Sequence, residues 1–227
     1  MAEIYLIRHG QASFGAENYD QLSELGAQQS RWLGEHLREL DVSVDGLLMG
    51  ELARHRQTAE ALCDGAGLQL QPEIHAGLNE FDFQSVVNAY LAQNPVFDLS
   101  DKQASPKVYY RLLKEAMSAW QQGQLVADRL PESWQQFSQR VAAVLDHIRA
   151  AHADRRRLLV VTSGGVIAMC MKHMLGTDDR HVIELNLQIR NSSVTQVFYN
   201  RDVLRLAAFN QVAHLEQPQR QRAITYS

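Results

Sequence analysis

The sequence predicts an α/β fold: a three-layer sandwich with a mostly parallel central sheet, helices on both faces and a helical cap insertion. The first observation is the order of elements. Short apolar runs typical of buried strands alternate with helical patterns at the start of the 227-residue chain, which is the signature of a parallel sheet. The second observation is that residues 84–153 are rich in helix formers and contain no convincing strand, as expected of a helical insertion.

The first half of the chain supports this prediction element by element. Residues 4–7 are an apolar run rich in β-formers, and a polar loop leads from them to Ser23, a suitable helix N-cap. Apolar residues then recur at helical spacing through 24–40. Residues 47–49 indicate a second buried strand, and 53–66 a second helix that ends near glycines.

The second half begins with the insertion and then returns to the sheet. Three helices are expected in the insertion, over 84–93, 107–122 and 132–152. The buried-strand pattern returns at 157–162, and Gly164 opens a helix that runs to about residue 175. Residues 194–199 and 203–208 indicate a hairpin.

We therefore expect a single domain over 1–227, in which 84–153 is mostly helical and includes a cap. Residues 216–227 are polar, and we expect them to form a mobile tail.

Composition places the chain among globular proteins, with 45% hydrophobic and 21% charged residues. The formal net charge of -4 argues against nucleic-acid and membrane partners, which usually need a basic surface. The chain start lacks the features of a signal peptide, and no apolar run approaches the ~20 residues of a membrane span. We therefore predict a cytoplasmic protein. Two distant cysteines, Cys63 and Cys170, do not suggest a disulfide framework.

Residues suited to binding an anion follow the first two predicted strands. His9 comes directly after the first strand, beside Arg8. Neutral imidazole is a good nucleophile, a neighbouring cation disfavours its protonated form, and an arginine can hold two phosphate oxygens. Arg54 enters the helix after the second strand, where the helix N-terminus also attracts anions. His55 and Arg56 beside it are interpreted as ordinary solvated residues.

Two further candidates come later in the chain. Glu80 lies between the apolar residues Leu78 and Phe81, which would raise its pKa and suit it to protonate a leaving alkoxide, and Asp82 is an alternative. Ser163 and Gly164 follow the strand at 157–162 and open a helix whose dipole favours an anion. Each signal alone has an ordinary structural explanation. Carboxyl ends of parallel strands lie at one edge of a sheet, however, so we expect these residues to meet.

Six segments carry the pattern, in this order along the chain: 6–11, 20–26, 52–59, 78–81, 191–195 and 210–215. Together they resemble the histidine phosphatase superfamily, which includes the cofactor-dependent phosphoglycerate mutases. The resemblance covers nearly the whole chain.

The resemblance implies a chemical role for each residue. His9 would form a phosphohistidine that water hydrolyses, while Arg8 and Arg54 hold the phosphoryl oxygens. Glu80 would protonate the leaving group and later activate water. No metal or other cofactor is implied, because the arginines supply the positive charge. The further candidates for phosphate contacts are Ser163, Gly164, Gln11 and Ser13.

One departure bears on the activity. Ser163 stands where the family usually has a second histidine that donates a hydrogen bond to the transferred phosphate. Losing a strong donor to a transition state costs on the order of 10²–10³ in rate, and serine is a shorter, uncharged donor. Gly50 and Gln84 also depart, standing where serine and glycine are common.

We therefore predict a phosphomonoester hydrolase. Its turnover would be slow if Ser163 is a weaker hydrogen-bond donor than the histidine that the family has at this position. One alternative is a catalytically degenerate module that binds a phospholigand. A phosphoglycerate-type mutase is a second alternative. The acid segment argues against it, because it continues as Asp82-Phe83-Gln84-Ser85 where the mutases have a basic run with tyrosine and glycine. The expected partner is a small phosphorylated substrate or a phosphoprotein. The substrate's identity stays open, and so does a homodimer formed through an edge strand.

Overall fold

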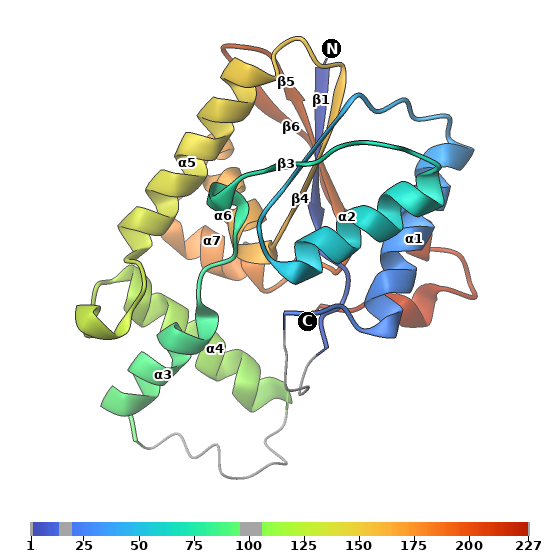
Figure 1. Cartoon of the computed structure of the whole chain (residues 1–227). Helices are drawn as coiled ribbons and strands as arrows, with labels where there is room; N and C mark the ends of the chain where they lie inside the picture. The colour runs from blue at the N-terminus through green and yellow to red at the C-terminus, as the bar shows by residue number, and fades with distance from the viewer. Residues whose placement is uncertain (1, 14–19, 96–105, 227) are drawn as a thin grey trace.

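The structure, a computed structural model, describes residues 2–13, 20–95 and 106–226 (Figure 1). Within these residues one six-stranded sheet has the order β3-β2-β4-β1-β5-β6. Its strands are β1 (Ala2–Arg8), β2 (Gly46–Met49), β3 (Glu73–Ile74), β4 (Arg157–Thr162), β5 (Val194–Tyr199) and β6 (Leu204–Gln211). The first four in that order pair in parallel, whereas β5 and β6 are antiparallel. The predicted mostly parallel sheet is confirmed.

Helices cover both faces of this sheet. In Figure 1, α1 (Glu24–Glu39) and α2 (Ala53–Ala66) lie on one side of the strands, and α5 (Trp134–Ala151) and α6 (Gly164–Leu175) lie on the other. Successive strand residues point to opposite faces, so both sets must be apolar when both faces are covered. In β4, Leu158 and Val160 enter the α5–α6 core. The alternate residues Leu159 and Val161 enter the α1–α2 core.

The insertion is helical, as predicted, but its helices have two different roles. The helices α3 (Phe83–Gln93) and α4 (Pro106–Gln121) project beyond the end of the sheet toward which β1 runs (Figure 1). The third, α5, belongs to the layer that covers the sheet. A cluster of stacked and tilted rings joins these parts, formed by Phe81, Trp120, Trp134 and Phe137.

Most predicted boundaries agree with the structure to within about two residues, which is the usual uncertainty of helix ends. Ser23 is the N-cap of α1 and accepts a hydrogen bond from the Gly26 N–H. Among the strands and α-helices of the described residues, the two-residue strand β3 and the short helix α7 (Asp179–Asn186) were not predicted. Strand β6 also extends three residues beyond the predicted end, to Gln211.

The C-terminal segment makes contacts that the prediction of a mobile tail did not include. The described residues, through Tyr226, form a short 3₁₀ turn in which Ala223 is buried. The Gln29 side chain of α1 donates to the Ala223 carbonyl at 2.6 Å, and the Thr225 hydroxyl donates to Asn191 at 2.9 Å. The apolar contacts of Ala223 with its neighbours explain why this polar stretch packs on α1.

Regarding the membrane prediction, no helix in the described part of the chain combines the length and the apolar character that a membrane crossing requires.

Candidate active site

The backbone holds His9 at the carboxyl end of β1. Its N–H donates to the Thr162 carbonyl at 2.9 Å, which continues the β1–β4 ladder by one residue. Its own carbonyl accepts from the Ser192 N–H at 3.2 Å. The side chain is only 4% exposed. The nucleophile predicted from the sequence is therefore held by the last residue of β4 and by the segment that precedes β5.

The hydrogen bonding of the His9 ring decides which nitrogen can react. Nδ1 lies 2.7 Å from the Gly10 carbonyl oxygen. A carbonyl only accepts, so Nδ1 carries the proton and Nε2 keeps its lone pair. Burial holds the pKa of His9 well below its ordinary value of 6.5, and the nearby charges of Arg54 and Arg8 lower it further. His9 is therefore a neutral imidazole with Nε2 able to attack.

Arg54 reaches the site from the first turn of α2. The residue is 6% exposed, and its guanidinium donates to Asp20 Oδ1 at 2.9 Å. The other oxygen of Asp20 accepts from the Ala53 N–H at 2.8 Å. The N-terminus of α2, which the sequence predicted to attract an anion, is thus already occupied by the carboxylate of Asp20.

Arg8 is oriented by main-chain oxygens. Its Nη1 donates to the carbonyl of Ile189, and also to that of Tyr226 at 2.6 Å. These two carbonyl oxygens orient the guanidinium, and its charge lowers the pKa of His9.

Glu80 faces the same centre. Its Oε2 accepts from the Gly165 N–H at 3.0 Å, and its Oε1 accepts from the Phe81 N–H at 3.2 Å. Burial raises the pKa of Glu80, against the lowering effects of the Gly165 hydrogen bond and of the two arginines. A Cβ at Gly165 would lie 2.3 Å from Glu80 Oε1, so only glycine permits this approach.

Asp82, the alternative acid, has another task. Its Oδ1 accepts from the Ser85 N–H at 3.0 Å and its Oδ2 from the Ser85 hydroxyl, so it is the N-cap of α3. This geometry favours Glu80 as the acid.

Ser163 does not act alone, because its hydroxyl pairs with a histidine from another element. His55 Nε2 of α2 lies 2.7 Å from Ser163 Oγ, and both side chains are fully buried. The His55 ring is also 5.8 Å, centroid to centroid, from the ring of His9. The interpretation of His55 as a solvated residue was wrong, since its ring fills the space between α2 and the carboxyl end of β4. Burial and the charge of Arg54 lower the pKa of His55 to about 3.

Gly50 completes this arrangement. A Cβ there would lie 2.4 Å from Nδ1 of the His55 ring. Two departures from the family pattern, Gly50 and Ser163, therefore surround one buried imidazole and make room for it.

Comparison with known protein families identifies the superfamily of this chain. The family model for the histidine phosphatase superfamily (branch 1) matches residues 4–94 and 101–212. The chain belongs to the histidine phosphatase superfamily. These ranges include His9, Arg54, Glu80 and Ser163, in agreement with the resemblance in the sequence.

Individual relatives within the superfamily carry different names. The chain is 27% identical over 232 residues to a Klebsiella pneumoniae protein named probable phosphoglycerate mutase GpmB, with 96% of this chain and 97% of that protein covered. Among solved structures, a phosphoglycerate mutase from Bacillus anthracis has a TM-score of 0.67 at 20% identity, and 94% of each chain is covered. An alpha-ribazole phosphatase from Shigella flexneri has a TM-score of 0.64 at 22% identity, covering 93% and 97%. These structures show the fold alone.

Gln11, Ser13 and Gly164 are the remaining predicted phosphate contacts. Gln11 Oε1 accepts from the Ser23 hydroxyl at 2.9 Å, so this side chain is bound to the start of α1. The Ser13 N–H donates to the Gln21 carbonyl, and the residue is half-buried. Gly164 is the first residue of α6, where a backbone N–H has no partner inside the helix. Contact of these three with phosphate stays a prediction.

Sequence reasoning missed two residues of this superfamily site, His55 and Asp20. Asp20 lies in a recognised segment, but its pairing with Arg54 bridges 34 residues and has no local pattern. His55 had a usable signal, since a histidine lies next to Arg54 in a chain that lacks the family's second histidine at 163.

Proposed function

We propose that this chain hydrolyses phosphomonoesters through a phosphohistidine at His9. The observation that carries the proposal is the state of His9: a buried, neutral imidazole with Nδ1 bound to a carbonyl and with two arginine charges beside it. A charged imidazolium could not attack phosphorus. Superfamily membership and the Glu80 geometry support the same reaction.

The reaction has two steps. His9 Nε2 attacks phosphorus, the P–O bond to the leaving group breaks, and Glu80 gives its proton to the departing alkoxide. Water then attacks the phosphohistidine and loses a proton to the Glu80 carboxylate, and the P–N bond breaks. Inorganic phosphate leaves, and both side chains return to their starting forms. Arg8 and Arg54 stabilise the charge on the phosphoryl oxygens in both steps.

His55 and Ser163 would supply the donor that the family takes from one histidine. His55 Nε2 and Ser163 Oγ share one hydrogen bond, whereas His55 Nδ1 is buried without a hydrogen-bond partner among the described residues. A buried N–H without a partner is rarer than an acceptor without one, which favours the tautomer with the proton on Nε2. Ser163 Oγ then accepts from His55, and its own O–H proton is released to donate to phosphate. His55 acts here as a positioning residue.

The test compares hydrolysis of 4-nitrophenyl phosphate by the parent, His9→Ala and Ser163→Ala. The parent should turn over, and His9→Ala should abolish turnover while retaining the parent's urea midpoint. Ser163→Ala should lose about 10²-fold in kcat, because one transition-state donor is removed. Equal turnover by the parent and His9→Ala would refute the proposal.

The phospholigand-binding alternative is favoured by one observation, the absence of a histidine at position 163. It predicts that the parent binds inorganic phosphate in calorimetry but turns over none of a panel of aryl and alkyl phosphates. The mutase alternative is supported by the names of the curated relatives. It predicts that activity depends on a bisphosphate primer.

A further inference from the structure

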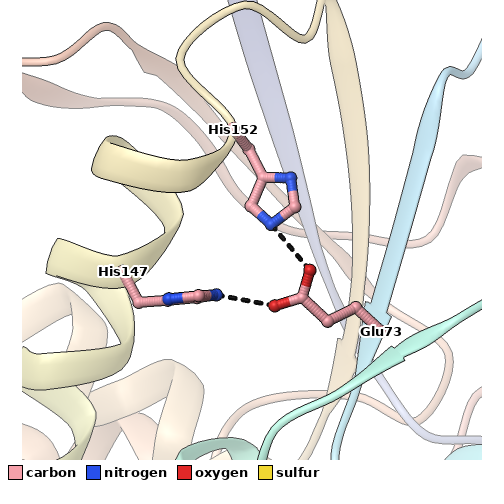
Figure 2. Close-up of side chains that lie close together, drawn as sticks. All are labelled: Glu73, His147 and His152. Carbon is pink, nitrogen blue, oxygen red and sulfur yellow. Dashed lines mark hydrogen bonds and ion pairs between the residues drawn. The ribbon is translucent and has the colours of Figure 1, made fainter.

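A second group of chemically reactive side chains lies at the β3 edge of the sheet. Figure 2 shows His147 from α5 and His152, the C-cap residue of that helix, pointing at the carboxylate of Glu73 on β3. His152 precedes β4 on the chain, whereas Ser163 follows it, so this cluster and the phosphoryl site lie toward opposite ends of β4. The proposed hydrolysis uses none of the three residues.

The donor atoms converge from both sides of the carboxylate. His147 Nε2 lies 2.6 Å from Glu73 Oε1, and His152 Nε2 lies 3.1 Å from Glu73 Oε2. One potential ligand atom from each residue lies within 4.8 Å of the other two.

Hydrogen bonding does not explain the orientation of the His152 ring, because its Nε2 has no such bond among the described residues. The residue is only 9% exposed. Its Nε2 is buried and makes no hydrogen bond among the described residues, despite the short distance to Glu73. The distance satisfies an ion pair, but the directions do not satisfy a hydrogen bond. A buried imidazole nitrogen aimed at a shared centre is the arrangement that a metal ligand requires.

We propose that Glu73, His147 and His152 bind one zinc ion. Two imidazole nitrogens and a carboxylate oxygen are a ligand set that Zn²⁺ accepts, with water completing a tetrahedron. Tetrahedral zinc with ligand bonds of about 2.0–2.2 Å holds its ligand atoms about 3.3 Å apart. The two imidazoles lie 2.6 and 3.1 Å from different oxygens of Glu73, so shifts of less than about 1 Å would bring each of these contacts to that spacing.

The neighbouring His75 is excluded from the ligand set. Its ring is 5.1 Å from that of His147, but its Nδ1 already accepts from the Gly77 N–H at 3.0 Å.

The consequence of zinc binding is structural. Strand β3 has two residues and pairs only with β2 among the described strands, so an ion bound to Glu73 would attach this edge strand to α5.

The test titrates the EDTA-treated full chain with ZnCl₂ in a calorimeter and follows its melting temperature. The parent should bind one equivalent and melt at a higher temperature with zinc, because zinc binds the folded state. Glu73→Gln and His147→Asn should each weaken zinc binding by at least about tenfold. His181→Asn is the matched control: His181 pairs with Asp178 on the surface at 2.9 Å in a pair outside the cluster, so this variant should bind zinc as the parent does.

Co²⁺ gives a readout that needs no substitution. Bound to the parent, it should show the intense visible absorption of a tetrahedral centre, and Zn²⁺ should displace it. Three results would each overturn the proposal: no zinc binding by the parent, an unchanged affinity in both Glu73→Gln and His147→Asn, or octahedral Co²⁺ spectra only. In the first case the cluster is an ion-pair group alone, and in the second zinc binds elsewhere.

Discussion

At the scale of single residues, the site depends on proton positions. In the proposed hydrolysis, His9 must be neutral to attack and Glu80 must be protonated to help the leaving group depart. The directions of their pKa shifts suit both demands, because burial lowers the pKa of one and raises that of the other. Opposite shifts in two titratable groups, each influenced by Arg8 and Arg54, are typical of acid–base assignments in enzymes.

Glu80→Gln tests the acid role through the leaving group. Hydrolysis of an alkyl phosphate should fall by about 10²–10⁴-fold, because an alkoxide needs a proton to depart. First-step cleavage of 4-nitrophenyl phosphate should fall much less, since nitrophenolate leaves without a proton. Single-turnover kinetics with both substrates measure this. Equal losses for the two substrates would assign Glu80 to another task, and Asp82→Asn serves as the neighbouring control.

The donor pair makes a separate prediction about additivity. If His55 acts only by orienting the Ser163 hydroxyl, then His55→Ala should lower kcat in the parent and have no further effect in Ser163→Ala. The double substitution His55→Ala with Ser163→His should restore activity that is lost in His55→Ala. It removes the imidazole ring that would clash sterically with a histidine at position 163. Additive losses in kcat for His55 and Ser163 would show that they act independently.

At the scale of elements, three parallel strand ends and the starts of two helices define the site. The strand and helix pattern predicted this arrangement, because the apolar runs, Ser23 and the glycines near 165 are local signals. Strand β3 could not be predicted, since two residues carry no periodicity. Helix α7 is short and follows another helix closely. The donor role of His55 depends on a contact across 108 residues, which no local pattern encodes.

Asp20 links the site to the stability of α2. Asp20→Ala should cost about 0.5–2 kcal/mol of unfolding free energy, because the helix loses a carboxylate acceptor at Ala53. Asp20→Asn keeps an oxygen for that bond and should lose much less stability. Both variants should raise KM for phosphate esters, since Arg54 loses its ion pair. Urea melts and steady-state kinetics separate the effects.

The control is Asp82→Ala, which removes the N-cap of α3. It should lower stability while KM stays unchanged. A parent-like KM in both Asp20 variants would show that Asp20 does not orient Arg54.

At the scale of the whole molecule, the chain buries several neutral histidines, and its C-terminal segment contacts Arg8 of the candidate site. The fold class followed from the sequence because it rests on periodicity over many residues. The contact between Arg8 and the Tyr226 carbonyl joins positions 218 residues apart and has no local sequence pattern. Only the polar composition of this segment was visible in the sequence, and it suggested a mobile tail.

Buried histidines make acid stability a property of the whole fold. The pKa values of His55 and His214 fall to about 3, chiefly because of burial. The unfolded chain, with histidine pKa values near 6.5, binds more protons between pH 6.5 and 3, so stability rises with pH in that window. The urea midpoint should therefore fall as pH is lowered from 6.5 to 4.5. His214→Asn should flatten this slope, and an unchanged slope would contradict the assignment.

The central claim is that His9 carries the phosphoryl group, and trapping that intermediate tests it most directly. Glu80→Gln should slow water attack more than formation of phosphohistidine from 4-nitrophenyl phosphate, so the intermediate should accumulate. Mass spectrometry of a neutral-quenched digest should find one acid-labile phosphate on the peptide containing His9. His9→Ala should carry none. Turnover by the parent with no phosphate ever found on His9, or with phosphate on another residue, would contradict the account.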